Sequence, residues 1–495
     1  MMDGRGKSDR PEVLTKPPNK ATAAEAVEGR GLAKGNAVQQ NVPRTQCRTR
    51  TPSALDCVRQ AAAKDRDAKL TALFHHVTVD LLRTSYHALK RTAAAGVDGV
   101  TWKQYGEDLE ANLQDLHRRL ERGAYRAKPS RRAFIPKADG KQRPLGIASL
   151  EDKVVQRAVV EVLNAIYEVD FLGFSYGFRP GRNQHRALDA LAVGILRKKV
   201  NWVLDADIRG FFDAIDHAWL LRFLGHRIGD RRILRLIQKW LSAGVLEDGK
   251  RVVETTGSPQ GATISPLLAN VYLHYAFDRW VEWWRRRHAR GDVVVVRYAD
   301  DIVLGFQYEA DAVRFRAELD QRLARFALGL NSEKTRLIRC GRYAAKERRA
   351  HGEGKPETFD FLGFTHICGT SRAGRYLLLR HTTRRRMRTV LRSMRLELLR
   401  RRHWPVPAQG AWLQRSLAGY FQYHAIPTNI PRLSAVRTQV ARAWHQALRR
   451  RSQRTRMPWA RMGCLVERWL PRPCVLHPWP EERYDAMTRG RSPVR

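Results

Sequence analysis

Two adjacent aspartates, Asp300 and Asp301, lie between two apolar runs. The runs, at 293–296 and 302–304, are rich in β-branched residues and predict two buried strands joined by a tight hairpin. Burial of the strands leaves both carboxylates on the exposed turn. Because adjacent carboxylates repel each other, a bound cation favours this arrangement. An ordinary turn that contains aspartate would give the same pattern, and a short Tyr-x-Asp-Asp match is weak evidence by itself.

A third carboxylate, Asp207, ends another predicted strand and can face the hairpin turn from a neighbouring strand. Such a trio can bridge two Mg²⁺ ions about 4 Å apart, with nucleotide phosphates and water completing the octahedral shells. One ion would activate a primer 3′-hydroxyl, and the other would bind the triphosphate; Mn²⁺ is a possible substitute. The rival ligands are Asp205, Asp213 and Asp216, for which solvated turn or capping roles are the alternative.

Cationic residues flank a second predicted hairpin. Lys137 and Arg143 lie on either side of residues 138–141, which contain a glycine and predict a turn between two strands. This hairpin can fold over a nucleotide and bring both cations to its triphosphate, and Arg131 is a third candidate. A charged surface hairpin without a ligand is the alternative.

The whole chain is strongly basic. Its 495 residues include 91 Lys and Arg against 49 Asp and Glu, a formal net charge of +42. This excess favours a polyanionic partner, and long nucleic acid is a commoner partner than an acidic membrane surface. The hydrophobic content of 43% excludes a wholly disordered basic chain. No apolar run approaches the ~20 residues that span a bilayer, and no signal peptide is evident, so we expect a soluble, intracellular protein without a membrane partner.

The composition changes along the chain predict an α+β fold with an antiparallel sheet, followed by helices. Residues 1–55 predict a disordered or loosely ordered basic arm, and residues 56–125 predict helices. Strand and helix signals alternate over residues 126–365. Residues 371–480 predict Arg-rich helices, and residues 481–495 form a C-terminal tail.

One predicted helix has a basic stripe beside an apolar stripe. The basic residues, spaced three or four apart, are Arg385, Arg388, Arg392 and Arg395, and the apolar ones are Met387, Leu391, Met394 and Leu398. A helix that packs by one face and exposes guanidinium groups on the next suits a phosphate backbone. A solvated basic helix is the alternative. The aromatic residues Tyr420, Phe421 and Tyr423 can stack on bases, but their spacing is more typical of a core.

Seven blocks in a fixed order resemble the group II intron-encoded reverse transcriptase/maturase family, from about Ala54 to His477. They are Arg143-Pro144-Leu145-Gly146-Ile147 with Gln156, Ser175-Tyr176-Gly177-Phe178-Arg179-Pro180-Gly181-Arg182, Asp207-Ile208-Arg209-Gly210-Phe211-Phe212-Asp213, Gly257-Ser258-Pro259-Gln260-Gly261, Ile264-Ser265-Pro266-Leu267-Leu268, Tyr298-Ala299-Asp300-Asp301 and Phe361-Leu362-Gly363-Phe364. Any one block is weak evidence, but the ordered set is specific.

The resemblance implies a right-hand polymerase, with fingers and palm over 126–365, fingers beginning within 56–125, and a helical thumb/maturase domain over 371–480. It implies Asp207, Asp300 and Asp301 as catalytic and metal-binding residues. The implied nucleotide-binding residues are Lys137, Arg143, Phe212, Gln260 and Arg131. Phe212 would exclude a ribose 2′-hydroxyl, although a core aromatic is the alternative. Lys334 would lie near primer-side phosphates, although an ordinary surface lysine is nearly as compatible. Ala262 departs from the second glycine that the family often has, which weakens the pocket inference if that position needs a positive φ.

The activity implied by the resemblance is RNA-directed DNA synthesis. The implied partners are group II intron RNA, an RNA template with a DNA primer, deoxynucleoside triphosphates and a DNA target, and the implied roles are splicing and retrohoming. Cys464 and Cys474 lack the paired spacing of an endonuclease domain, so we expect the compact bacterial form, cytoplasmic and nucleoid-associated when acting on DNA. A splicing cofactor without polymerase activity, and a domesticated reverse transcriptase in defence or repair, are the alternatives.

Overall fold

A four-stranded antiparallel sheet contains the two acidic segments singled out above. The structure is a computed structural model that describes residues 54–136, 142–247, 250–252, 256–257, 261–371, 373–452 and 456–488. The sheet has the strand order β6-β7-β3-β8, and its strands are β3 (Trp202–Asp207), β6 (Val293–Tyr298), β7 (Asp301–Phe306) and β8 (Arg336–Arg339). Strands β6 and β7 form the tight hairpin that the sequence predicts.

Both faces of this sheet are buried, which explains the nearly continuous apolar runs. Side chains alternate between faces along a strand. In β6, Val295 packs into the larger core, whereas Val294 and Val296 pack into a second core under α6 (Gln184–Arg197). Helix α12 (Glu309–Ala324) packs on β3 and β7. A sheet covered on both sides leaves only the ends of its strands available to a ligand.

Helices precede and surround this sheet in the first two thirds of the chain. The N-terminal helices are α1 (Ala54–Lys64), η2 (Phe74–His76), α2 (Val79–Ala88), α3 (Trp102–Glu107) and α4 (Leu109–Glu121). The following ones are α5 (Leu150–Asp170), α7 (Phe211–Ala214), α8 (His217–Gly225), α9 (Arg231–Ser242), α10 (Ser265–Leu273), the π-helical turn η3 (His274–Asp278), α11 (Arg279–Arg287) and α13 (Ala344–Ala350). Helices therefore make up most of residues 56–125. Residues 1–53 of the predicted arm lie outside the described residues.

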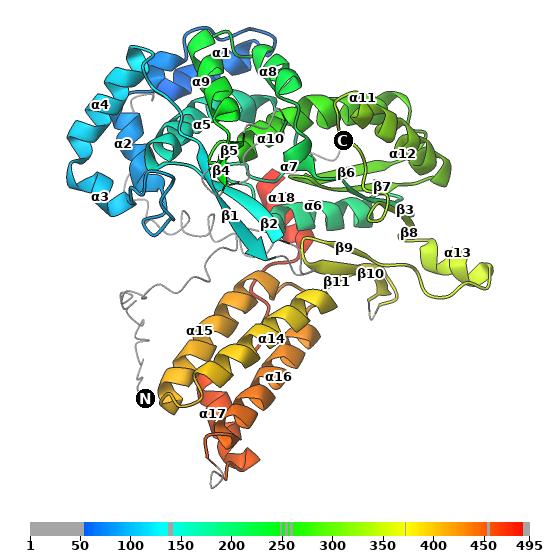
Figure 1. Cartoon of the computed structure of the whole chain (residues 1–495). Helices are drawn as coiled ribbons and strands as arrows, with labels where there is room; N and C mark the ends of the chain where they lie inside the picture. Colours follow the sequence, from blue (N-terminus) through cyan, green and yellow to red (C-terminus); the bar gives the residue numbers. More distant parts are fainter. Residues whose placement is uncertain are drawn as a thin grey trace, which may run out of the picture. The chain divides into compact units, whose positions relative to one another are not determined.

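A second sheet, of order β2-β1-β4-β5, contains the predicted cationic hairpin. Its strands are β1 (Ser130–Pro136), β2 (Gln142–Ile147), β4 (Val245–Glu247) and β5 (Lys250–Val252). Strands β1 and β2 pair antiparallel, as predicted, but β1 and β4 pair in parallel. The long chain between β1 and β4 permits the crossover that this parallel pairing needs. Figure 1 shows β1 and β2 extending together from the helices around them.

A three-stranded sheet connects the central sheet to the C-terminal helices. It has the order β11-β10-β9 and contains β9 (Phe359–Phe361), β10 (Phe364–Thr370) and β11 (Tyr376–Thr382). The sequence placed the start of the Arg-rich helices at residue 371, which was wrong, because β10 and β11 form a hairpin across that point. Arg380 lies in β11, is buried, and donates a 3.0 Å hydrogen bond from Nη1 to Asp189. It therefore belongs to the core and not to the exposed basic stripe.

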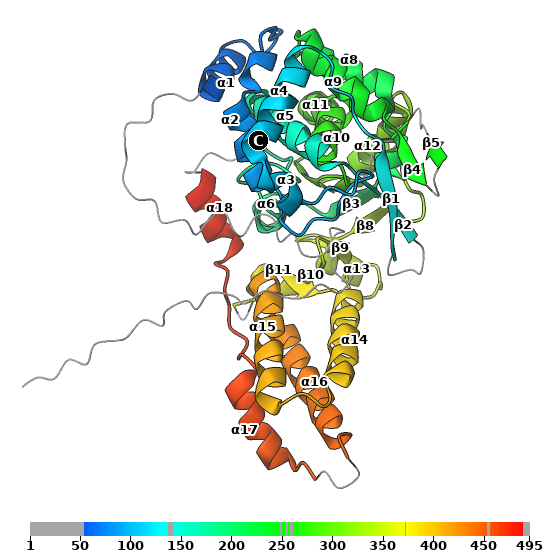
Figure 2. The ribbon, with the colours of Figure 1, turned by 60° about the vertical axis from the view of Figure 1, so that its left-hand side comes forward.

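The C-terminal helices are α14 (Arg384–Arg400), α15 (Val406–His424), α16 (Ile430–Arg449) and α17 (Trp459–Trp469). Helices α14, α15 and α16 lie side by side in both views (Figure 1, Figure 2). They share a third apolar core that includes the predicted stripe residues Met394 and Leu398. Tyr420 and Phe421 are buried in this core, which confirms the core alternative for these rings.

The expected C-terminal tail begins with a helix, α18 (Pro480–Thr488), which packs on α6. Tyr484 is buried in the core under α6, and Asp485 accepts two hydrogen bonds from Arg197. The sequence did not predict this helix, because one buried residue, Tyr484, among charged residues forms no apolar stripe. Among the helices that the structure describes, none combines the length and the apolar character needed to cross a membrane.

Candidate active site

Three side chains form a row across the end of the central sheet. The register pairs Asp207 of β3 with Asp301 of β7, and Asp301 in turn with Tyr298 of β6. Directly paired residues of antiparallel strands project to the same face, about 4.5–5.5 Å apart between Cα atoms. Asp300 occupies the turn with Ala299, whose φ is +56°. The sequence predicted this adjacency of Asp207 to the paired aspartates from strand signals alone.

A buried ion pair holds the turn from the other face of the sheet. Arg297 donates to both carboxylate oxygens of Asp278, at 2.7 and 2.6 Å, and neither side chain is exposed. The same guanidinium donates at 3.0 Å to the carbonyl oxygen of Ala299 and at 3.0 Å to Asn270. Because Asn270 also donates at 2.7 Å to the Gly177 carbonyl, the acidic turn and the segment around residue 177 share one hydrogen-bonded network.

The loop before β8 holds Asp207 from a third direction. Asn331 donates its backbone N–H to the Asp207 carbonyl at 2.8 Å and its side-chain amide to Oδ2 at 3.3 Å. Lys334 Nζ lies 3.0 Å from the same Oδ2, with its side chain 60% exposed. The structure therefore brings Lys334 to the paired carboxylates Asp207 and Asp301, which with Asp300 are called the acidic row below. An ion pair this exposed contributes little to stability, so the ammonium can leave the carboxylate at small cost.

The three rival carboxylates have separate positions. Asp216 accepts a 2.7 Å bond from the Trp219 N–H and caps α8, which confirms the capping role. Asp213 lies in the first turn of α7. Asp205 lies within β3, two residues before Asp207 on the same face, and is partly buried. The prediction of a solvated turn or cap was therefore wrong for Asp205, because β3 begins at Trp202 and continues through it.

Asp205 has a raised pKa, chiefly because it is buried. Burial, and then the nearby charges of Asp301 and Asp207, raise the pKa of Asp205 to about 7, although Arg336 acts in the opposite direction. Asp205 therefore carries only part of a negative charge near neutral pH.

The donor set fits a hard divalent cation, because such ions prefer carboxylate oxygens. Within the described parts of the chain, no three acidic, histidine or cysteine side chains converge closely enough to hold a metal ion by themselves. Mg²⁺ in nucleotide-processing sites typically uses one or two carboxylates and completes its shell with water and substrate phosphates. The acidic row matches that open type of site and not an all-protein cage.

Three of the sequence blocks make close backbone contacts with other blocks. Phe212 is partly buried and contacts Phe211 edge-on, with ring centroids 5.3 Å apart. A Cβ on Gly257 would lie 3.4 Å from the Phe212 carbonyl oxygen, and a Cβ on Gly261 would lie 2.9 Å from that of Gly146. Gly261 has a φ of +108°, whereas Ala262 has no positive φ, so the alanine at this position is compatible with the loop.

The predicted nucleotide-binding cations are only partly described. Lys137 and Gln260 lie outside the described residues, as does the side chain of Arg143, whose backbone pairs with Ile135. The Arg131 guanidinium donates to the Ala95 carbonyl oxygen at 3.2 and 3.0 Å.

The predicted basic stripe is exposed on α14. Arg385, Arg388, Arg392 and Arg395 are all solvent-exposed, and none of them has an ion-pair partner among the described residues. On the neighbouring face, Met394 and Leu398 are buried against the other C-terminal helices.

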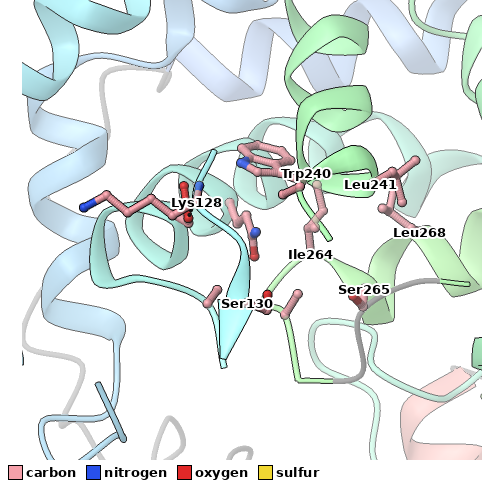
Figure 3. A pocket seen from close by; sticks show the side chains of 12 residues that line it. Lys128, Ser130, Trp240, Leu241, Ile264, Ser265 and Leu268 are labelled. Atoms are coloured by element: carbon pink, nitrogen blue, oxygen red, sulfur yellow. Dashed lines mark hydrogen bonds between the residues drawn. The ribbon is translucent and has the colours of Figure 1, made fainter. Parts of the chain in front are cut away.

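A small pocket lies under the base of the β1–β2 hairpin, apart from the acidic row (Figure 3). Its polar residues are already bonded: Asp152 accepts from Ser149 Oγ at 2.7 Å, and Gln156 accepts from the Thr263 N–H at 3.0 Å. Lys128 directs its ammonium away from the cavity, toward Asp98 (Figure 3). This pocket therefore serves packing, and Gln156 anchors the loop that follows Gly261.

Sequence reasoning missed Arg297, Asp278 and Asn270. One signal was available: Arg297 extends an apolar strand run, and a charged residue inside a buried strand requires a partner. Nothing in the sequence indicated which distant residue would be that partner.

Comparison with known proteins agrees with this arrangement. Residues 135–366 match the family model described as reverse transcriptase (RNA-dependent DNA polymerase). Protein YkfC of Escherichia coli is 34% identical over 300 residues, which cover 52% of this chain and 77% of that protein. The group II intron-encoded protein LtrA of Lactococcus lactis is 34% identical over 226 residues, covering 45% of this chain but only 37% of LtrA. Nuclear intron maturase 1 of Arabidopsis thaliana is 32% identical over 114 residues, covering 22% of this chain and 15% of that protein. The chain belongs to the reverse transcriptase family, among the group II intron-encoded reverse transcriptases and maturases.

Proposed function

We propose that the chain is an RNA-directed DNA polymerase of a group II intron, which also binds intron RNA to assist splicing and retrohoming. The observation that supports this most is the row of Tyr298, Asp301 and Asp207, with Asp300 on the adjoining turn, in a chain of the reverse transcriptase family. Members of this family generally use divalent metal ions.

In this proposal Asp207, Asp300 and Asp301 bind two Mg²⁺ ions. When bound, these ions would lower the pKa of the primer 3′-hydroxyl and neutralise charge on the triphosphate and the departing pyrophosphate. The chain contributes position: Arg297 fixes the turn through the Ala299 carbonyl. Because the strand ends already hold the carboxylates in place, little conformational entropy of these side chains is lost when the reactants bind.

The remaining site residues would select and orient the nucleotide. Lys137, Arg143 and Arg131 would contact the triphosphate, Gln260 would line the pocket, and Phe212 would exclude a 2′-hydroxyl. Lys334 would exchange its contact with Asp207 for a phosphate when metal binds.

The right-hand polymerase description assigns these parts to regions. The β1–β2 hairpin and its helices would be the fingers, the central sheet the palm, and helices α14–α17 the thumb and maturase domain. The proposed regions 1–55, 56–125 and 126–365 are kept, whereas the proposed thumb and maturase helices start at Arg384 instead of residue 371, and α18 (Pro480–Thr488) follows them.

Primer extension by the purified full chain tests the proposal. With an RNA template, a DNA primer, deoxynucleoside triphosphates and Mg²⁺, we expect templated extension, and much less with ribonucleoside triphosphates. RNA binding without extension would contradict the enzymatic proposal and favour a splicing cofactor.

Neutralising the α14 stripe should weaken RNA binding in a salt-dependent way. Changing Arg385, Arg388, Arg392 and Arg395 to Gln removes four exposed cations that have room to bind phosphates. Removing one cation that binds a phosphate reduces the slope of log K against log salt by about 0.7–0.9. We expect the slope measured with structured intron RNA to fall by up to about 3–4, while the melting temperature stays unchanged.

Arg316→Gln on α12 is the matched control, since Arg316 is also exposed. Arg316→Gln should change the slope of log K against log salt by no more than about 0.9, the largest effect of removing a single cation that binds phosphate. An unchanged slope in the four-residue variant would mean that RNA binds elsewhere.

A further inference from the structure

One exposed aromatic residue beside the acidic turn has an unfavourable backbone conformation. Phe178 has a φ of +56°, and its side chain is 53% exposed. A positive φ is uncommon for any residue with a Cβ and strained for a bulky one. An exposed ring also forgoes the stabilisation that burial of an aromatic side chain provides. Both features oppose folding, and strained exposed residues concentrate at functional sites.

The segment around Phe178 is rigidly held. The Tyr176 N–H donates to the Arg297 carbonyl at 2.8 Å. A Cβ on Gly177 would lie 2.3 Å from the Ala299 nitrogen, so these two backbones are in direct contact. On the other side, Arg179 is only 3% exposed and donates to Glu168 and to the carbonyls of Leu172 and Ser175. The exposed ring is therefore presented from a fixed backbone that contacts the acidic turn.

The ring lies next to Tyr298, which is paired with the proposed catalytic residue Asp301. Its centroid is 6.4 Å from that of Tyr298, with an interplanar angle of 44°. Tyr298 is paired with Asp301 across the hairpin. Ser175 forms a bridge with Arg297 on β6, which is the edge strand of the sheet. Phe212, by contrast, follows β3, two strands away.

We propose that Phe178 stacks on the terminal nucleotide of the primer strand and holds its 3′-hydroxyl beside the acidic row. This inference rests on the proposed polymerase function. The β6 edge and Phe212, one of the proposed nucleotide-binding residues, lie on opposite sides of β7. An aromatic face suits any base, as a non-specific polymerase requires, and stacking of this kind contributes about 5- to 150-fold in affinity per base.

Four substitutions separate this role from a structural one. Phe178→Ala should weaken binding of an RNA template–DNA primer duplex about 5- to 150-fold by fluorescence anisotropy, while the KM for the incoming nucleotide changes less than about twofold. Phe178→Tyr and Phe178→Trp keep an aromatic face and should retain affinity within about threefold. Phe178→Gly removes the ring but tolerates the positive φ, so the melting temperature should hold or rise while primer affinity falls.

A primer that ends in an abasic nucleotide, combined with Phe178→Ala, forms a double-mutant cycle. The unaltered chain should bind this primer less tightly than a normal primer. Phe178→Ala should bind the abasic and the normal primer with equal affinity, since the abasic nucleotide and the substitution remove the same stacking interaction. The inference is overturned if Phe178→Gly lowers stability and affinity together, if the effects of the variant and the abasic primer add, or if only the nucleotide KM changes. Anisotropy reports binding without turnover, so an unaltered chain that binds the duplex but never extends it contradicts the proposed function instead.

Discussion

Asp301→Asn should reduce the rate of single-nucleotide extension by at least about a thousandfold, equivalent to ~4 kcal/mol in the activation free energy. Asparagine has the same shape and keeps the cross-strand pairing with Asp207 and Tyr298. It removes the negative charge that a hard cation needs. The measurement is rapid-quench extension with saturating primer, nucleotide and Mg²⁺.

The loss should be confined to chemistry. RNA affinity should be unchanged, because the exposed arginines that we assign to RNA binding lie on α14. Asp320→Asn on α12 is the matched control, since Asp320 is exposed and is not one of the paired residues at the strand ends, and it should extend at the original rate. Extension by Asp301→Asn within tenfold of the unaltered rate would contradict the proposed metal-binding role.

Arg297→Met should lower the free energy of unfolding by about 3–5 kcal/mol, because it leaves the Asp278 carboxylate buried without a counter-charge. Methionine approximates the aliphatic length of arginine but donates no hydrogen bond. The Ala299 carbonyl loses its donor, so the acidic turn should also lose its fixed position. Chemical denaturation and primer extension together measure both effects.

A second substitution separates charge burial from turn positioning. Asp278→Leu added to Arg297→Met removes both charges and should restore part of the stability, since buried ion pairs are often replaceable by apolar residues. Extension should stay low, because Ala299 still lacks its donor. Arg286→Met is the control: Arg286 is 72% exposed, and the loss of its ion pair with Glu282 should cost less than about 1 kcal/mol. Full recovery of extension in the double variant would show that Arg297 acts only on stability.

The parts of the fold that could be predicted from the sequence are those encoded locally. The β6–β7 hairpin follows from β-branched runs on either side of a polar centre, and the apolar face of α14 follows from helical spacing. The proximity of Asp207 to Asp301 was inferable because strand ends with carboxylates meet at one edge of a sheet.

Features that depend on long-range packing could not be predicted. The Arg297–Asp278 pair joins β6 to a π-helical turn, and no spacing rule connects them. The Sγ atoms of Cys340 and Cys368 lie 3.2 Å apart, although the sequence separates them by 28 residues. In the sequence, Phe178 has no role beyond its place in a motif. Its positive φ and its exposure depend on the contact between Gly177 and Ala299, which the sequence does not reveal.

The central claim is that Asp207 and the Asp300–Asp301 turn share metal ions. Electron paramagnetic resonance of Mn²⁺ tests it directly, on the full chain bound to an RNA template, a dideoxy-terminated primer and the next nucleotide. Two ions within about 4 Å should give a spin-coupled spectrum. That spectrum should vanish in Asp207→Asn and in Asp301→Asn but persist in Asp320→Asn. The same coupled spectrum in all three variants, or none in the unaltered complex, would contradict the account.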